Sequence, residues 1–406
     1  MAGGDLLAHV IIRNTPDAAQ MLAQMRTDAR FDVSDDDGAC VPDWGAVTAI
    51  RSDPPPPKVP KVFMSNDCVF NCAYCTCRTT RDCRRYALQP RELARWAVRE
   101  AEGQHRGIFL TSAIYRNADY TEELIIETLK IIRRDHGFGG YVHAKIMPGA
   151  DPLLIAEAGR WADRLSVNIE VARSEGYRMV AKQKNRNNIL TPMRQISDLI
   201  AGTKGGRGRF ATSQTTQLMA GAAGEDDHTI LTLSRALYDR YRLSRVYYTA
   251  FHYTQEAKGY DLPPTVTPHW RMARLYQADR LMQLYGFAPE ELAPEDAPLL
   301  AQDIDPKTAW ALRNLHLFPV EANTADYEML LRVPGLGVTS AKRIVAARRM
   351  GTLTFDILRR IGVSLKRSQF FLTCGGRMQQ RAMPDVAALH GVLAVHRGFE
   401  QMTLEM

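Results

Sequence analysis

Short apolar runs alternate with longer amphipathic segments between residues 61 and 262. The apolar runs are rich in β-branched residues and predict strands at 62–66, 107–112, 141–148, 164–171, 211–220 and 245–252. Amphipathic segments at 90–102, 120–136, 152–158 and 227–241 predict helices between them. Right-handed crossovers curl such a series of βα units, so we expect an α/β fold whose first domain is a partial (βα)6 TIM-like barrel. Its site should lie at the carboxyl ends of the strands.

The remaining pattern divides the chain further. The predicted units are an arm and linker at 1–59, the barrel at 60–262, a helical connector at 263–322, a helical module at 323–380 and a terminal helix and tail at 381–406. Within the arm we expect one helix at 16–30, an acidic turn at 35–38 and a breaker of four prolines at 54–57. After the barrel, helices are expected at 268–285, 306–312, 324–332, 340–349 and 385–396, so the part that follows the barrel should be all-α. Residues 182–209 are polar, basic and rich in glycine, which indicates a mobile loop inside the barrel.

Composition and charge narrow the class of protein. An apolar fraction of 45% over 406 residues fills a substantial core and excludes a largely disordered chain. We find no apolar run of about 18 residues and no secretion signal, so we expect a soluble cytoplasmic protein with no membrane partner. Five of the seven cysteines fall between residues 68 and 83. Such clustering favours metal chemistry in a reducing compartment over a framework of disulfides.

The cysteine cluster has a specific spacing. Cys68, Cys72 and Cys75 form CxxxCxxC directly after the first predicted strand, and Tyr74 precedes the last cysteine. Three thiolates on one compact loop can bind three irons of a 4Fe-4S cube and leave the fourth iron open to a small molecule. The alternative is a zinc knuckle in which Cys77 or Cys83 supplies a fourth thiolate, although structural zinc normally uses paired ligand knuckles.

This segment closely resembles the cysteine loop of the radical SAM superfamily. The resemblance implies a radical SAM barrel in which S-adenosyl-L-methionine binds the open iron and is cleaved by one-electron reduction to a 5′-deoxyadenosyl radical. Cys68, Cys72 and Cys75 would then be both the metal ligands and the catalytic residues. The strand ends resemble the superfamily's cofactor contacts, including a polar row on the fourth strand and a Gly-containing turn at 217–225. The expected cofactor-binding residues are Tyr74, Thr111, Ser112, Ser166, Asn168, Glu170, Gly221 and Glu225.

The module carries a second motif. Two predicted helices flank Val333-Pro334-Gly335-Leu336-Gly337, a pattern that matches the helix-hairpin-helix motif of DNA-binding proteins. Glycines let such a hairpin expose backbone N–H groups to a phosphate. Between Arg332 and Arg377 the chain has ten basic residues and one acidic residue, Asp356, and a degenerate second hairpin is suggested at 361–363. The expected nucleic-acid contacts are Val333, Gly335, Gly337, Lys342, Arg343, Lys366 and Arg367. The alternative is a hairpin that only packs helices or contacts protein.

From Lys61 to about Gly376 the chain resembles the DNA modification/repair radical SAM protein family, in segments such as "GYVHAKIMPGADPLLIAEAG", "RLSVNIEV" and "SAKRIVAARR". It departs from the family at the N-terminal arm, Cys77 and Ala113. The resemblance implies DNA as substrate, an electron donor such as flavodoxin or ferredoxin, and a uracil-DNA-glycosylase-like partner.

We therefore expect the module to hold DNA while an extruded or single-stranded nucleotide enters the barrel mouth. Candidate substrate contacts are Tyr115, His143, Lys145, Tyr247, Tyr248 and His252, and Cys374 is a candidate hydrogen donor. Three alternatives stay open: an RNA-modifying radical enzyme, a non-catalytic Fe-S protein that binds DNA, and a radical enzyme that acts on a small molecule or a protein.

Overall fold

The computed structural model describes residues 59–104, 107–203, 209–251, 260, 267–380 and 384–394. The cysteine loop at 68–83 and the helical module at 323–380 lie entirely within these ranges. The expected helix at 16–30, the acidic turn and the proline breaker lie outside the described residues, as does His252.

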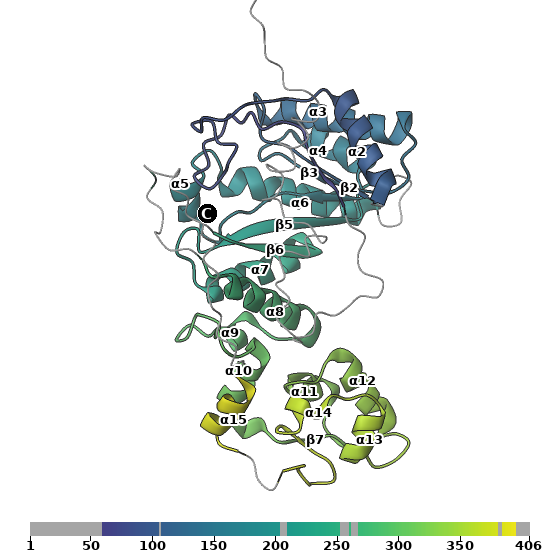
Figure 1. Ribbon diagram of the computed structural model, residues 1–406, viewed down its shortest axis with the longest axis vertical. Helices are drawn as coiled ribbons and strands as arrows, with labels where there is room; N and C mark the ends of the chain where they lie inside the picture. Colours follow the sequence, from purple (N-terminus) through teal and green to yellow (C-terminus); the bar gives the residue numbers. More distant parts are fainter. Residues whose placement is uncertain are drawn as a thin grey trace, which may run out of the picture.

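The core of the larger part is a six-stranded sheet whose strands are parallel and stand in chain order (Figure 1). The strands are β1 Lys61–Phe63, β2 Gly107–Thr111, β3 Tyr141–Lys145, β4 Arg164–Ser166, β5 Ser213–Ala220 and β6 Arg245–Ala250. The helices between them are α2 Pro90–Gln104, α3 Ala118–Lys130 with the π-helical turn η1 Ile131–Asp135, α4 Pro152–Trp161, α5 Ser174–Val180, α6 Arg186–Thr203 and α7 Asp227–Tyr241. Parallel order with helical crossovers fits the predicted partial TIM-like barrel.

The side chains of the last two strands show which face of the sheet meets the helices. Tyr248 donates its hydroxyl to Ser234 Oγ on α7 at 2.8 Å, and Gln214 donates its amide to the carbonyl of Met193 on α6 at 3.0 Å. Even-numbered residues of β5 and β6 at these positions therefore face outward. Side chains alternate along a strand, so Thr215 belongs to the opposite face, which we call the inner face.

The segment expected to be a mobile loop folds mostly as helix α6. Ile189, Met193, Ile196 and Ile200 recur at helical spacing and are all buried. The helix contacts both α4 and β5, so its apolar stripe has a partner on each side. The loop prediction was therefore wrong for 186–203, because the polar and glycine residues hid an amphipathic period. The Gly-rich residues 204–208 lie outside the described part.

The fourth strand is shorter than predicted. β4 ends at Ser166, and Glu170 has a positive φ of 63°, so regular alternation stops before the predicted end at 171. Asn168 and Glu170 are buried, but Val167 and Ile169 are buried as well. Both alternating sets of side chains are therefore buried along this segment. The predicted row of polar residues on one side of the strand holds only at the start of the segment.

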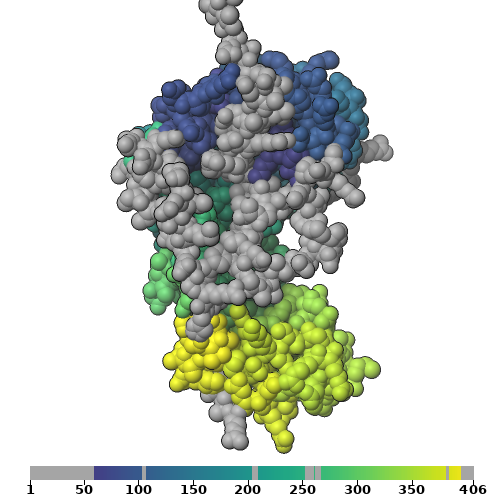
Figure 2. All heavy atoms as spheres, in the orientation of Figure 1, coloured from purple at the N-terminus to yellow at the C-terminus, as the bar shows by residue number. Residues whose placement is uncertain are grey.

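The remaining elements form the connector and the module, which lie below the barrel in Figures 1 and 2. They are α8 His269–Tyr285, α9 Pro289–Leu292, α10 Pro306–Arg313, the 3-10 turn Leu315–Leu317, β7 Val320–Glu321, α11 Tyr327–Arg332, α12 Val338–Ala347, α13 Phe355–Arg360, α14 Leu365–Ser368, β8 Leu372–Thr373 and α15 Val386–Leu393.

The part after the barrel is not purely helical. β7, at the end of the connector, pairs in parallel with β8, near the end of the module. The sequence predicted helices alone. Two residues per strand are too few to show a period, which is why the pattern missed them. The terminal helix α15 packs on α10 of the connector. Among the described helices, none combines the length and the apolar character that a membrane span requires.

Candidate active site

The cysteine loop leaves the carboxyl end of β1 and is closed by one arginine. The guanidinium of Arg85 donates hydrogen bonds to the carbonyls of Asn66 at 2.6 Å, Cys77 at 2.8 Å, Arg78 at 2.6 Å and Arg81 at 2.9 Å. These carbonyls come from both sides of the cysteines. The loop shape is therefore held by the protein itself.

Two of the three motif sulfurs accept backbone N–H groups. Cys68 Sγ receives the N–H of Phe70 at 3.4 Å, and Cys75 Sγ receives the N–H of Cys77 at 3.4 Å. Burial raises the pKa of the Cys68 thiol and raises that of Cys72 to about 12, whereas hydrogen bonds from Cys77 lower the pKa of Cys75 to about 7. Buried thiolates at the first two positions thus need a compensating positive charge.

The donor set fits the cluster predicted from the motif. It consists of three thiols on one loop, and N–H donors to sulfur are among the protein's means of tuning iron-sulfur clusters. Within the described part of the chain, no three His, Cys, Asp or Glu side chains gather as ligands of a single metal ion. A cube does not require that gathering, since each thiolate binds a different iron.

A buried ion pair lies beside the thiols. Lys184 Nζ is 2.6 Å from Glu170 Oε1 and 3.3 Å from the hydroxyl oxygen of Tyr74. The side chains of Lys184 and Glu170 are only 11% and 4% exposed. The charge of Lys184 opposes the burial that raises the pKa of Cys68 and Cys72, and it adds to the hydrogen bonds from Cys77 that lower the pKa of Cys75.

The chain between α5 and α6 brings Lys184 to this place. The N–H of Ala73 donates to the carbonyl of Val180 at 2.8 Å, and the N–H of Asn71 donates to Gln183 Oε1 at 3.4 Å. Sequence reasoning missed Lys184, because it falls in the segment predicted as a loop. No signal in the sequence separates it from Lys182, which is exposed.

The predicted cofactor residues near the sheet are placed as follows. Thr111 and Ser112 are buried at the end of β2, and Ser112 Oγ donates to the carbonyl of Ala113 at 2.7 Å. Ser166 Oγ lies 2.8 Å from His143 Nε2. Asn168 is buried at the broken end of the fourth strand. Tyr74 and Glu170 belong to the Lys184 pair described above.

The turn after β5 is organised from within. Gly221 has a φ of +82°, and a Cβ there would stand 2.2 Å from Thr267 Oγ1. The carboxylate of Glu225 accepts the N–H of Ala172 at 3.3 Å and the N–H of Ala223 at 3.0 Å. Glu225 thus ties two backbone segments together, and its expected contact with the cofactor stays a prediction.

The candidate substrate contacts separate into two groups. His143, Lys145 and Tyr247 lie on the inner face, and the ring of His143 stacks on Phe109 with centroids 4.1 Å apart. Tyr248 faces the helices, where it bonds Ser234 and Asp279, so its prediction as a substrate contact was wrong. Of the other two candidates, Tyr115 follows β2 beside Tyr120, and His252 lies outside the described residues. Cys374, the candidate hydrogen donor, is buried in the module.

The module contains two glycine turns that pack against each other's second helix. Gly335 and Gly362 have φ values of +84° and +79°. A Cβ on Gly335 would lie 3.0 Å from Arg367 Cβ, and one on Gly362 would lie 2.5 Å from Arg343 Nη1. This reciprocal arrangement places two similar helical hairpins side by side.

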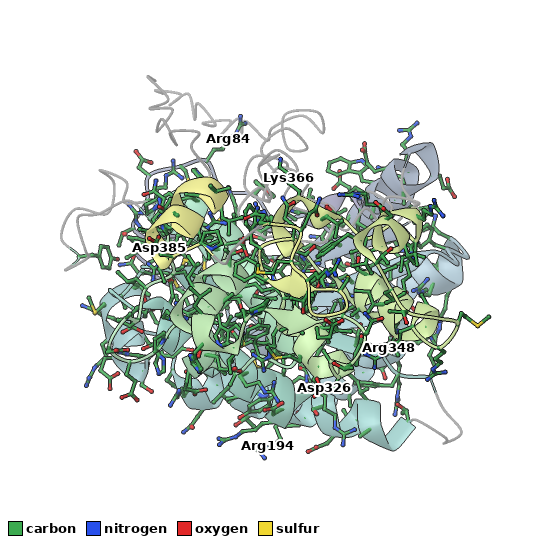
Figure 3. The ribbon with its side chains drawn as sticks, turned by 90° about the horizontal axis from the view of Figure 1, so that it is seen from below. Arg84, Arg194, Asp326, Arg348, Lys366 and Asp385 are labelled. Atoms are coloured by element: carbon green, nitrogen blue, oxygen red, sulfur yellow. The ribbon has the colours of Figure 1, made fainter. Side chains whose placement is uncertain are left out.

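Several expected phosphate contacts are used inside the protein. Val333 is buried and donates its N–H to the carbonyl of Leu330 at 3.2 Å. Arg343 donates to the carbonyl of Ile361 at 3.1 Å, and Arg367 forms an ion pair with Asp305 at 2.6 Å. Other cations of the module are exposed to solvent (Lys366 is labelled in Figure 3), and they include Lys342, Arg349, Arg360, Lys366 and Arg377.

The first hairpin is also held from the connector. Gly337 caps the N-terminus of α12, and a Cβ on it would lie 3.5 Å from the hydroxyl oxygen of Tyr285. Lys307 Nζ donates to the carbonyl of Leu336 at 2.6 Å and lies 4.8 Å from the centre of the Tyr285 ring. The hairpin turn is therefore fixed to α8 and α10.

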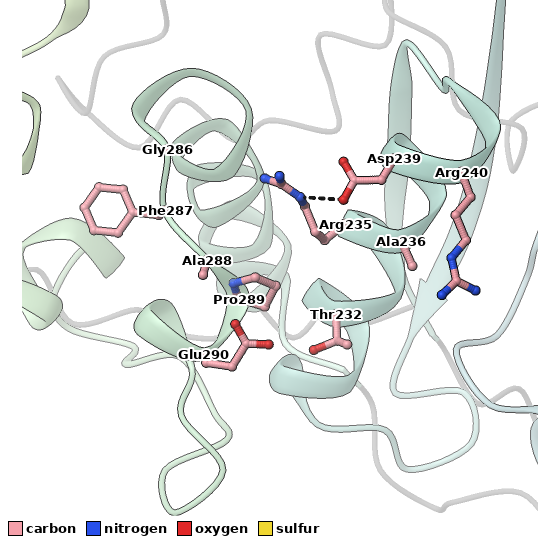
Figure 4. Close-up of a pocket in the computed structure, with 10 residues that line it drawn as sticks. All are labelled: Thr232, Arg235, Ala236, Asp239, Arg240, Gly286, Phe287, Ala288, Pro289 and Glu290. Carbon is pink, nitrogen blue, oxygen red and sulfur yellow. Dashed lines mark hydrogen bonds and ion pairs between the residues drawn. The ribbon is translucent and has the colours of Figure 1, made fainter. Parts of the chain in front are cut away.

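A surface hollow of about 450 Å³ lies between α7 and residues 286–290 (Figure 4). Arg235 and Asp239 form an ion pair of 2.9 Å on its wall. It is lined by Thr232, Arg235, Ala236, Asp239, Arg240, Gly286, Phe287, Ala288, Pro289 and Glu290. None of the predicted site residues lines it, so we do not place the candidate site there.

Comparisons with known proteins give structural matches only. No protein-family model and no curated protein matches the chain, so the resemblance to the DNA modification/repair family stays a prediction. Similar solved structures include the FeFe-hydrogenase maturase HydG from Carboxydothermus hydrogenoformans, with 15% identity, a TM-score of 0.41, and coverage of 55% of this chain and 51% of that one. Methylornithine synthase PylB matches with 14% identity, a TM-score of 0.42, and coverage of 55% and 61%. SuiB from Streptococcus suis, bound to S-adenosylmethionine, matches with 12% identity, a TM-score of 0.39, and coverage of 55% and 47%. The chain thus spans about half to three fifths of the length of these structures.

Proposed function

We propose that this protein is a radical SAM enzyme that acts on DNA. The observation that carries the proposal is the CxxxCxxC loop at the carboxyl end of β1 of a parallel six-stranded sheet, with N–H groups donated to two of its sulfurs. Three thiolates on such a loop leave one corner of a 4Fe-4S cube without a protein ligand.

When bound together, the cluster and S-adenosyl-L-methionine supply reductive cleavage to a 5′-deoxyadenosyl radical. The chain's own residues have other tasks. Cys68, Cys72 and Cys75 hold the cluster, and Arg85 keeps their loop closed. Glu225 shapes the turn after β5, where the adenosine moiety would bind. The side chains of His143 and Ser166 lie on the inner face of the sheet.

DNA is proposed as the substrate because of the module. Two reciprocally packed hairpins carry exposed cations, and Lys342 and Lys366 each stand on the second helix of one hairpin. Cations in that position bind phosphates without reading sequence, so the module would hold the backbone while a nucleotide is extruded toward the barrel. A flavodoxin or ferredoxin would donate the electron, and a uracil-DNA-glycosylase-like protein would act beside it.

The chemistry is tested with protein reconstituted anaerobically with iron and sulfide. Given dithionite and S-adenosyl-L-methionine, the protein should release 5′-deoxyadenosine, measured by chromatography and mass spectrometry. Iron and sulfide should be present at about four each per chain, as a 4Fe-4S cube requires. Zinc in place of iron, or an intact cube without 5′-deoxyadenosine, would contradict the proposal.

The substrate is tested by DNA binding at several salt concentrations. Replacing Lys342 and Lys366 together by Glu should weaken binding and reduce the slope of log K against log salt by about 2, since each lost phosphate contact removes about 0.9. The control is Arg95→Glu with Arg99→Glu, which makes the same charge change on exposed positions of α2. Equal losses in the two double variants, or tighter binding to RNA of the same length, would argue against DNA recognition by the module.

A further inference from the structure

The ammonium of Lys184 lies against the cysteine loop, where it contacts the hydroxyl of Tyr74, a residue between Cys72 and Cys75 in the chain. The neighbouring residue Gln183 accepts the N–H of Asn71, from the same loop, at 3.4 Å. The ion pair therefore stands beside the loop that carries the three thiols, with its ammonium bonded to a residue of that loop.

The geometry keeps that charge in place. The carboxylate of Glu170 and the hydroxyl of Tyr74 both accept hydrogen bonds from Nζ, at 2.6 Å and 3.3 Å. The side chain of Lys184 is 11% exposed, so water screens it little. The backbone bond from Ala73 to Val180 anchors the segment that carries Lys184 to the cysteine loop.

Protein charges and exposure are main determinants of an iron-sulfur potential, and a fixed cation favours the state with one more electron. We propose that Lys184 is a positioning residue that makes the cluster easier to reduce, with Glu170 and Tyr74 holding its charge beside the thiolates. This inference rests on the proposed function, because it assumes a cluster on Cys68, Cys72 and Cys75.

The test is a redox titration of the reconstituted protein without S-adenosyl-L-methionine, in which electron paramagnetic resonance reports the reduced cluster. At a fixed solution potential, Lys184→Met should lower the ratio of reduced to oxidised cluster about tenfold, a shift of about 59 mV for one electron. Glu170→Gln should raise the ratio, because it removes the opposing charge. Lys184→Arg should keep the ratio near that of the unchanged protein.

The matched control is Lys182→Met, which removes the same charge from an exposed side chain two residues away and should leave the ratio unchanged. If Lys184→Met fails to fold, the other two variants still test the inference. Glu170→Gln should raise the ratio of reduced to oxidised cluster, and Lys184→Arg should leave that ratio unchanged. The inference is overturned if Lys184→Met and Lys182→Met titrate alike, or if Lys184→Met alters only cofactor binding. Absence of iron and sulfide from the unchanged protein would instead overturn the proposed function.

Discussion

Two lysines among the described residues have little exposed surface, Lys184 beside the cysteine loop and Lys307 at the junction with the module, and their pKa values shift in opposite directions. At the cysteine loop, burial alone would lower the pKa of Lys184, but the carboxylate of Glu170 and the nearby thiols outweigh it and raise the pKa. At the junction with the module, Lys307 donates to the carbonyl of Leu336 and lies over the ring of Tyr285. Burial lowers its pKa to about 7, and the charge of Asp305 offsets only part of that.

The difference shows that the partner, more than the depth, decides whether a buried lysine is charged. A carboxylate in contact compensates the lost hydration, and a carbonyl oxygen does so only in part. The cysteine region therefore keeps a permanent cation beside its thiols. The junction has a group whose charge depends on conditions near neutral pH.

The largest effect should separate the two regions by their cysteines. Cys72→Ser should reduce the iron bound after reconstitution at least about tenfold, because one corner of the cube loses its ligand. Cys374→Ser, the corresponding change of a buried cysteine in the module, should bind iron like the unchanged protein. Colorimetric iron and sulfide assays check both. If the two variants lost iron equally, the two regions would not differ in cluster binding.

The next effect compares the lysines directly in protein without cluster. Lys184→Met leaves the carboxylate of Glu170 buried without its partner, which should lower the free energy of unfolding by about 3–5 kcal/mol. Lys307→Met removes a poorly compensated buried ammonium along with one hydrogen bond, so its effect at pH 7 should be clearly smaller. Urea denaturation followed by circular dichroism measures both. A Lys307→Met variant as destabilised as Lys184→Met would show that the two sites do not differ in compensation.

The sequence predicted a large part of the fold and the centre of the site. Six predicted strands appear in order, because buried parallel strands give strong apolar runs. The spacing of Cys68, Cys72 and Cys75 carries the cluster prediction by itself. These features are local, and a single sequence displays local features well.

The features that the sequence did not reveal depend on contacts between distant segments. Lys184 contacts Tyr74, which is 110 residues away in the chain, and the segment that carries Lys184 is bonded to the cysteine loop through Val180 and Ala73. Arg367 resembles a phosphate ligand until Asp305 is brought beside it. The helical spacing of apolar residues in α6 is present in the sequence, but the polar and glycine residues of the segment led to the prediction of a loop. That error was one of interpretation.

A smaller effect should show that the two hairpins of the module depend on close packing against each other. Gly335→Ala adds the strain of a positive φ and a contact of 3.0 Å with Arg367 Cβ, whereas Gly375→Ala adds strain alone, since nothing lies within 4 Å of its Cβ position. We expect Gly335→Ala to lose about 1–2 kcal/mol more than Gly375→Ala. Thermal denaturation of both variants measures the difference, and equal losses would mean that the two hairpins do not constrain each other.

The last comparison concerns the pH dependence that the titration of Lys307 should give to the stability of the protein. The folded pKa of Lys307 is about 7, below its unfolded value of about 10.4, so between these pH values the unfolded chain binds a proton that the folded chain lacks. The free energy of unfolding should therefore rise with pH in this window, by at most about 1.4 kcal/mol per pH unit from this group. Below pH 7 both states are protonated and the folded state bears the cost of a buried ammonium.

Lys307→Met removes this titration, so the difference in unfolding free energy between the unchanged protein and the variant should grow in favour of the unchanged protein from pH 7 to pH 9. Urea denaturation at several pH values measures it. Lys184 should contribute no such rise, because its raised pKa keeps it protonated in the folded state throughout that range. Parallel curves for the unchanged protein and Lys307→Met would mean that Lys307 keeps its charge as Lys184 does, and the contrast between the two regions would then rest on packing alone.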